Sequence, residues 1–471
     1  MVDYRLDINI GNGIVPMSNR LRDLPSIGKV LEHPEIIGLI NIYSLNTVTQ
    51  LVREIVNDAR KSVLFDDSQS SLDVIVCKTK HKAEAKWNYA PVSVVNATGV
   101  ILHTNLGRAI LSTQAIEKMS TAAGDYTNLE YDLFEGKRGS RQKFVSNLIN
   151  QLTGSEASLV VNNNAAAILL VLSAIASNKE AIVSRGESVE IGGGFRIPDV
   201  LRLSNARIVE VGTTNRTYAS DYEDAITDKT GAILVVHASN FKQTGFVHSP
   251  EISELVNVGI NKGIPVIHDL GSGCFVDTTQ FGLPQEPMPQ DSIVKGVSLA
   301  MFSGDKLMGG PQCGIIAGRK EIVEVISRHP LYRAIRIDKV NLAGLTATLL
   351  HYVQNNHLEE IPILKMISQS ESDLKLRSSN WQKAIGKSVG IIKGYSTIGG
   401  GSMPEETLPT WLLALSSGTN PARTRLIFDL LRKSKPPIIG RIENDMVLLD
   451  PRTVLPKQDD IFISEVAKIL N

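Results

Sequence analysis

The spacing of apolar positions changes along the chain, and its first pattern is helical. Between Asn46 and Phe65 apolar residues recur three and four positions apart, with Asn46 or Thr47 as the expected N-cap. One face of this amphipathic helix would be formed by Val48, Leu51, Val52, Ile55, Val56, Ala59 and Val63. A shorter helix is predicted around Ser26 to Leu31, ending near Pro34, because proline stops a helical run. Residues 1–85 are therefore predicted to form a mostly helical module.

From Val94 to about Arg319, short apolar runs alternate with helical stretches, and each run ends in small or polar residues. The predicted strands are residues 158–161, 181–183, 207–211, 232–236, 265–268, 297–302 and 315–317. This alternation indicates an α/β domain with a largely parallel sheet. Ligands of such sheets bind at the carboxyl ends of the strands, so the functional residues should follow these runs.

Beyond about Val340 the pattern predicts a small α+β domain. Two helices are expected at residues 345–357 and 361–376, and an amphipathic helix at 423–431. An apolar run at 408–415 and a hairpin within 438–449, turning near Glu443 to Asp445, supply strands. The predicted domains are thus residues 1–85, 86–340 and 341–471.

Composition is that of an ordinary globular protein, with 42% apolar and 21% charged residues in 471. Cys77, Cys274 and Cys313 form no metal-binding pattern, so we expect no metal and a reducing, cytoplasmic setting. The charged N-terminus lacks a signal-peptide core, and no long apolar run predicts a membrane span. The chain has 49 Lys plus Arg residues and 49 Asp plus Glu residues. This balance gives no overall positive charge that would indicate binding to nucleic acid, including DNA.

Lys306 lies on a turn of small residues between two predicted strands. Ser303 and Gly304 precede it, and Gly309-Gly310-Pro311 follows it. Small residues there would allow a flat ligand to lie against the backbone beside the amine. A lysine in such a place suits Schiff-base chemistry with an aldehyde cofactor. The alternative is a solvated lysine in a β-turn.

Two more predicted strand ends carry candidate cofactor ligands. The run Val160 to Val161 passes through Asn162, Asn163 and Asn164 into a helix, whose N-terminus could bind a phosphate, although asparagine is also a routine N-cap. Asp269 follows another strand and precedes a glycine-flanked turn. Its carboxylate could hold a protonated ring nitrogen, or it could be an N-cap.

The order asparagine loop, strand-end aspartate and turn lysine resembles the aspartate-aminotransferase-like, fold type I pyridoxal-phosphate enzymes. The resemblance implies that Asn162, Asn163 and Asn164 bind the phosphate of pyridoxal 5′-phosphate (PLP). It also implies that Asp269 binds the pyridine nitrogen and that Lys306 forms the Schiff base.

Longer blocks resemble a narrower family, bacterial selenocysteine synthase, or L-seryl-tRNA(Sec) selenium transferase. The resemblance runs from Leu24 to Val454, and the blocks that carry it are residues 95–108, 128–132, 136–141, 184–198, 303–312 and 330–339. It implies conversion of seryl-tRNA(Sec) to selenocysteyl-tRNA(Sec) with selenophosphate, through an aminoacrylyl-tRNA intermediate. Lys306 would remove the Cα proton, and Asp305 matches a position implicated in the chemistry.

The same resemblance assigns the substrate anion and the partners. Arg108, Arg333 and Arg336 match the selenophosphate-binding arginines, and on a helix Arg333 and Arg336 would share a face. A solvated helix face is the alternative for that pair. The family implies a homo-oligomer, a ring of dimers, with tRNA on the N-terminal module. Candidate tRNA contacts are the lysine-rich run 78–86, which could equally be a solvated lysine face, and Arg53, Arg60 and Lys61.

Some residues depart from the family pattern, and two other functions compete with this interpretation. His268 stands where an acidic residue is common, Cys274 and Cys313 occupy usually small positions, and residues 238–242 differ from a more usual Thr-Ser-Asn-Tyr-Arg. One rival is a PLP-dependent β-eliminating lyase on a small amino acid or amino sugar acid; the N-terminal module favours the tRNA substrate instead. The other is a tRNA-binding or regulatory protein with a degenerate cofactor site, which the complete residue set disfavours.

Overall fold

A computed structural model of the chain describes residues 24–62, 71–87, 90–191, 194–386, 389–416 and 420–470. The chain divides into two compact units, Met1–Ser93 and Val94–Asn471. The predicted domain boundaries at 85/86 and 340/341 stay predictions. None of the helices in the described ranges has both the length and the apolar content needed to cross a membrane.

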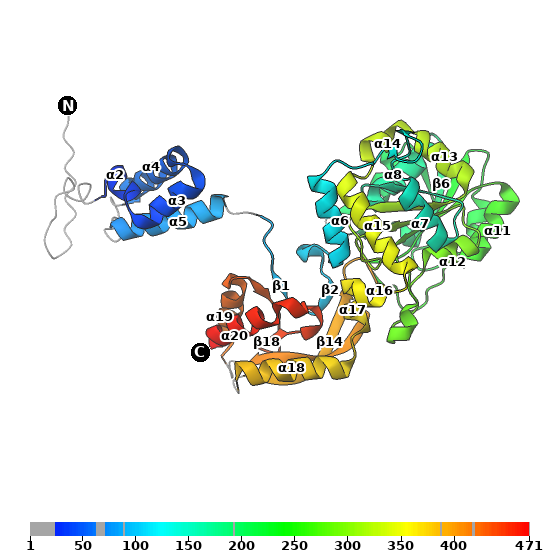
Figure 1. The fold of residues 1–471 in the computed structure, drawn as a ribbon. Helices are drawn as coiled ribbons and strands as arrows, with labels where there is room; N and C mark the ends of the chain where they lie inside the picture. Colours follow the sequence, from blue (N-terminus) through cyan, green and yellow to red (C-terminus); the bar gives the residue numbers. More distant parts are fainter. Residues whose placement is uncertain are drawn as a thin grey trace, which may run out of the picture. The chain divides into compact units, whose positions relative to one another are not determined.

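The described part of the first unit consists of helices, drawn in blue in Figure 1. They are α2 (Ile27–Leu31), α3 (Pro34–Tyr43), α4 (Leu45–Ser62) and α5 (Leu72–Trp87). The predicted apolar face of α4 is buried from Val48 to Ala59, and it packs with Val30, Ile36 and Ile75 of the other helices. Burial of this stripe is what stabilises so small a bundle.

The short helix predicted around Ser26 to Leu31 is confirmed as α2, with Ser26 as its N-cap. Helix α3 was not predicted; Pro34 begins it, because proline is favoured in the first helical turn. The N-cap predicted for α4 is wrong. Neither Asn46 nor Thr47 is the N-cap of α4, which already begins at Leu45. Ser44 takes that place, and its Oγ accepts a hydrogen bond from the Thr47 N–H at 3.5 Å. The predicted helix end, residues 63–65, lies outside the described residues.

The second unit contains a seven-stranded sheet in the order β5-β13-β12-β11-β10-β6-β9. All seven strands were predicted, and their bounds are β5 (Ala157–Val161), β6 (Glu180–Ser184), β9 (Arg207–Val211), β10 (Thr230–Val236), β11 (Val266–Gly271), β12 (Leu299–Ser303) and β13 (Gly314–Gly318). Pairing is parallel from β12 through β9, while β13 runs antiparallel to both β12 and β5. The prediction of a largely parallel sheet is confirmed.

Helices cover both faces of this sheet, so its strands are buried on two sides. Val160 and Val161, adjacent on β5, lie in different apolar clusters, one on each face. One face packs against α7 (Lys143–Thr153), α11 (Ile252–Lys262) and α15 (Lys339–Val353). The other packs against α8 (Asn164–Ile175), α9 (Ile197–Leu203) and α13 (Lys320–Arg328). The remaining helices of this region are α6 (Thr113–Gly124), α10 (Ala219–Asp224), α12 (Pro289–Val294) and α14 (Pro330–Ile335).

A five-stranded sheet, β17-β18-β15-β14-β2, organises the C-terminal part. Figure 1 shows β14 and β18 in one lobe with α18, α19 and α20. The strands are β2 (Val100–Leu102), β14 (Val389–Gly399), β15 (Thr407–Ser416), β17 (Arg441–Glu443) and β18 (Met446–Leu449). The helices are α16 (His357–Glu360), α17 (Pro362–Ser368), α18 (Glu371–Ile385), α19 (Pro421–Lys433) and α20 (Asp459–Leu470).

The sequence predicted this region in part. The strand at 408–415, the helix at 423–431 and the hairpin are confirmed, and the turn uses Asn444 and Asp445 with positive φ. The single helix predicted at 361–376 is wrong, because α17 ends at Ser368 and Ser370 caps the new helix α18. β14 was not predicted.

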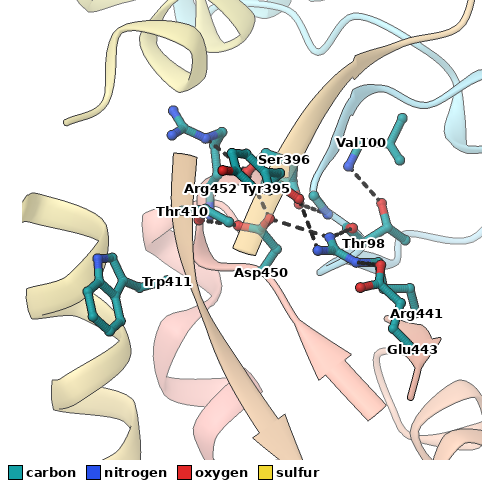
Figure 2. Close-up of polar contacts among 12 residues, drawn as sticks. Thr98, Val100, Tyr395, Ser396, Thr410, Trp411, Arg441, Glu443, Asp450 and Arg452 are labelled. Atoms are coloured by element: carbon teal, nitrogen blue, oxygen red, sulfur yellow. Dashed lines mark hydrogen bonds and ion pairs between the residues drawn. The ribbon is translucent and has the colours of Figure 1, made fainter. Parts of the chain in front are cut away.

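A buried polar cluster ties the segment before β2 to the C-terminal sheet (Figure 2). Asp450 accepts hydrogen bonds from the hydroxyls of Ser396 and Thr410, at 2.8 and 3.0 Å. Arg441 reaches the Thr98 carbonyl oxygen at 2.5 Å, and the Asp450 backbone N–H donates to Ala97 at 2.9 Å. Arg108 follows β2 closely in the chain, so these bonds help to position the segment that carries this arginine.

Candidate active site

Lys306 follows β12 and is held inside the protein. Its residue is only 8% exposed, so the alternative of a solvated lysine is wrong. Burial lowers the pKa of the Lys306 amine below its usual range, and the nearby carboxylates of Asp269 and Asp305 oppose that shift. A lowered pKa shifts the amine toward the unprotonated form, which nucleophilic and basic chemistry requires.

Asp269, near the carboxyl end of β11, is the second buried ionisable group. Its Oδ1 accepts hydrogen bonds from the side chain of Asn164 at 2.8 Å and from the Gly271 N–H at 3.2 Å. Burial raises the pKa of Asp269, while the Asn164 bond and the Lys306 charge lower it. The strand continues to Gly271, so Asp269 is not a helix N-cap.

The asparagine loop divides into three roles. Asn163 caps α8, with its side-chain oxygen accepting from the Ala166 N–H at 2.8 Å. Asn164 holds Asp269, and both asparagines line the same cavity as Lys306. Asn162 is exposed and lies outside that lining; its backbone N–H donates to the Ile335 carbonyl at 2.8 Å. Asn163, Asn164 and Ala165 all line the cavity, so the N-terminus of α8 lies at the cavity wall.

Arg108 and Asp305 form an ion pair at the cavity. Arg108 Nη1 lies 2.7 Å from Asp305 Oδ2, and the Ala109 N–H donates to the Asp305 carbonyl at 3.3 Å. The Asp305 carboxylate is therefore held beside Lys306 by the guanidinium group of Arg108, which lies in the segment after β2. The structure brings the predicted residues Arg108, Asp305 and Lys306 together.

Arg333 and Arg336 do not line this cavity within one chain. Arg333 is exposed on α14, whereas Arg336 lies just past the end of that helix in extended conformation. The two arginines therefore do not share a helix face. Arg336 Nη1 is 3.7 Å from Glu130 Oε1, and the Arg336 backbone bridges to Val161, next to the asparagine loop.

The cavity itself has a volume of about 340 Å³ and includes residues that the sequence analysis did not select. Among these are His237, Ser239, Gly271 and Gln312. His237 directly follows β10, so the rule that strand ends carry function could have found it. Its Nε2 lies 3.5 Å from Oε1 of the buried Glu286, an oxygen that has no hydrogen bond within the described residues.

The glycines around Lys306 do not act as the sequence analysis expected. A side chain at Gly304 would meet Cys313, and one at Gly309 would meet Ile361, so both glycines permit close packing inside the protein. Two glycines approach the amine: Gly401, from the loop after β14, and Gly271, at the end of β11. A methyl group on Gly401 would stand 3.0 Å from Lys306 Nζ, and one on Gly271 would stand 3.7 Å from it.

Three of the departures from the family pattern, His268, Cys274 and Cys313, lie outside the lining of the Lys306 cavity. His268 is buried on β11, with Nδ1 at 3.0 Å from Ser292 Oγ, and burial lowers its pKa to about 3. Cys274 and Cys313 are buried, and burial raises the pKa of both thiols, that of Cys274 to about 12. These residues are neutral packing groups near neutral pH.

Sequence comparison identifies the family of this site. A family model described as L-seryl-tRNA selenium transferase matches residues 94–455. The chain belongs to that family. A second model, selenocysteine synthase N terminal, matches residues 21–60. The L-seryl-tRNA(Sec) selenium transferase of Clostridium perfringens is 44% identical, covering 95% of this chain and 98% of that protein. The one of Carboxydothermus hydrogenoformans is 43% identical, covering 93% and 96%.

Structural comparison agrees with the predicted fold. D-Glucosaminate-6-phosphate ammonia-lyase matches with a TM-score of 0.55 and 21% identity, over 80% of this chain and 95% of that one. At this identity the likeness speaks for the fold alone. The prediction of a fold type I α/β architecture with a helical N-terminal module is confirmed.

Proposed function

We propose that the chain converts seryl-tRNA(Sec) to selenocysteyl-tRNA(Sec), with PLP as cofactor and selenophosphate as selenium donor. The observation that carries this proposal is the buried Lys306 amine, which shares one cavity with Asp269 and Arg108 in a member of the selenium transferase family. The predicted alternative, a β-eliminating lyase on a small amino acid or amino sugar acid, is supported only by a likeness of fold.

The residues present fit PLP. A buried carboxylate at Asp269 calls for a positive partner, which a protonated ring nitrogen would provide. The free N–H groups at the N-terminus of α8 suit a phosphate. Asn164 Oδ1 is buried and without a hydrogen bond within the described residues, so the loop still has an acceptor to satisfy. PLP would supply an aldehyde that forms a Schiff base with amines and a ring that withdraws electrons from Cα.

The chain's own residues would then divide the remaining work. Lys306 Nζ, whose pKa is lowered by burial, would remove the Cα proton of the seryl group. Asp305 would lie beside that proton transfer, fixed in orientation by Arg108 at 2.7 Å. Asn163 would hold the start of α8 in place, and Asn164 would orient Asp269.

Arginines would bind the selenium donor, because planar guanidinium groups match tetrahedral oxyanions. Arg108 is already at the cavity, paired with Asp305. Arg333 and Arg336 would join it by side-chain movement or from a second copy of the chain. Arg336 would have to break its ion pair with Glu130 before it could bind selenophosphate.

The N-terminal unit would hold tRNA, and the active form would be a ring of dimers. Exposed apolar side chains at Tyr126, Leu133, Phe134 and Phe144 support association between copies. Arg53, Arg60 and Lys61 are exposed on α4 and stay candidates for tRNA contact. Lys80, Lys82 and Lys86 pair with acidic groups of α3 and α4, which supports the solvated lysine face for that run.

Covalent trapping of the cofactor tests the proposal. After borohydride reduction of the purified protein, mass spectrometry should find a pyridoxyl group on Lys306. The Lys306→Ala variant should lack that adduct, while Lys295→Ala, which removes an exposed lysine, should retain it. An adduct that persists in Lys306→Ala would overturn the assignment.

A further inference from the structure

A second cavity, of about 460 Å³, adjoins the Lys306 cavity. Its lining comes from residues 240–242, from Thr397 and Gly399 of β14, and from residues 400, 401 and 403–406 of the loop after β14. The two cavities have neighbouring walls, because Ser239 lines the first and Asn240 the second. Gly401 lines the second cavity while its missing side chain would point at Lys306 Nζ.

Three glycines give this cavity a bare backbone wall. Side chains at Gly399 and Gly400 would collide with Val100 and Thr104, and one at Gly401 would collide with Lys306. The side of these three glycines that faces the cavity therefore presents backbone atoms. The loop has positive φ at Gly399 and Gly401, which glycine adopts freely, and also at Met403 and Glu405, where it is strained; such strain often accompanies binding sites.

Residues 240–242 contribute an aromatic ring and an amide oxygen that has no hydrogen bond within the described residues. Phe241 is partly buried and lines the cavity beside Asn240. The side chain of Asn240 donates to the Glu190 carbonyl at 3.0 Å, but its buried Oδ1 has no partner within the described residues. A flat group with hydrogen-bond donors could stack on the ring and satisfy that oxygen.

The charges at the rim decide between a phosphate and an uncharged group. Lys242 Nζ is 2.9 Å from Glu406 Oε1, so its charge is already neutralised. Glu405 adds a further carboxylate. Carboxylates would repel a phosphate inside the cavity, so a nucleoside bound there must direct its 5′-phosphate away from Glu405 and Glu406.

We propose that this cavity binds the 3′-terminal nucleoside of the aminoacyl-tRNA, with its base on Phe241. This inference rests on the proposed function, because the seryl group that must reach Lys306 is joined to that nucleoside by one ester. The volume is in the range of small-molecule sites, and aromatic stacking takes a base without reading the sequence. Gly401 is then the point past which the seryl group enters the Lys306 cavity.

Calorimetric titration of the cofactor-loaded full-length protein tests this subsite. The probes are 3′-deoxy-3′-(L-serylamino)adenosine, a stable amide, and L-serinamide, which lacks the nucleoside. Loss of a base–aromatic stack is worth about 5- to 150-fold in affinity. The adenosine probe should therefore bind at least about 5-fold more tightly than L-serinamide. Phe241→Leu should abolish that advantage and leave L-serinamide unchanged.

The control is Phe246→Leu, because Phe246 is an exposed ring outside the cavity lining. It should keep the advantage of the adenosine probe. Equal affinities of the two probes in the parent protein would overturn the proposal, and this comparison needs no variant to fold. Neither probe needs selenophosphate, so failure of selenium transfer and failure of the subsite are separate results.

Discussion

Two adjacent residues of β11 show how burial fixes charge at the scale of the residue. Asp269 faces the Lys306 cavity, while His268 packs against Ser292 of α12 on the other face of the sheet. Burial raises the pKa of the Asp269 carboxyl, and the Asn164 hydrogen bond and the Lys306 charge oppose that shift. The His268 imidazole is hydrogen-bonded to the uncharged hydroxyl of Ser292, and burial therefore keeps the imidazole neutral.

His268 should make the protein less stable in acid. Its pKa is about 3 when folded and near 6.5 when unfolded, so below pH 6.5 the unfolded chain binds a proton that the folded chain does not. The stability contributed by this group is complete above pH 6.5 and is lost as the pH falls toward 3. The slope from this residue reaches about 1.4 kcal/mol per pH unit.

Urea unfolding at several pH values between 4 and 7 measures this slope. His268→Gln should lose stability less steeply with acid than the parent does, because glutamine does not titrate. His81→Gln removes an exposed histidine and should follow the parent curve. Parallel curves for the parent and His268→Gln would contradict the assignment of a neutral buried histidine.

At the scale of the element, the sequence predicts strands well where both faces are buried. The seven strands of the central sheet are short apolar runs, and four predicted cofactor ligands or catalytic residues, Asn163, Asn164, Asp269 and Lys306, follow such runs. β14 was missed because Gly390, Lys393 and Gly394 interrupt its apolar pattern. Gly401 and Glu286 were missed because only tertiary packing brings them to Lys306 and His237.

The buried Arg452 should stabilise the C-terminal sheet. It is 1% exposed and donates to Ser396 Oγ at 3.0 Å, the Met366 carbonyl at 2.7 Å and the Pro409 carbonyl at 2.6 Å. Arg452→Met would leave these acceptors without that donor and should cost about 3–5 kcal/mol in the free energy of unfolding.

Urea denaturation gives this cost directly. The control is Arg432→Met, because Arg432 is exposed and pairs with Asp429 in solvent, so its loss should cost less than about 1 kcal/mol. Similar losses of stability in the two variants would show that the cluster around Asp450 does not hold the sheet together.

At the scale of the whole molecule, the chain consists of two units with separate apolar cores. Lys306, Asp269 and Arg108 all lie in the second unit. Cofactor chemistry and tRNA binding are thus expected to be separable by truncation.

Removal of residues 1–93 should abolish turnover of seryl-tRNA(Sec) and leave the cofactor bound to Lys306. The reason is that the deleted unit contributes none of the residues that line the Lys306 cavity. Cofactor absorbance and borohydride trapping test whether the second unit still binds the cofactor. Product formation on the tRNA tests the role of the first unit. Unchanged turnover by the truncated protein would refute the assignment of tRNA binding to the N-terminal unit.

The central claim concerns the substrate, and one incubation tests it most directly. Purified protein loaded with PLP is mixed with seryl-tRNA(Sec) and selenophosphate, the ester is hydrolysed, and the released amino acid is identified by mass spectrometry. We predict selenocysteine from the parent and serine from Lys306→Ala. Recovery of serine alone from the cofactor-loaded parent would contradict the account.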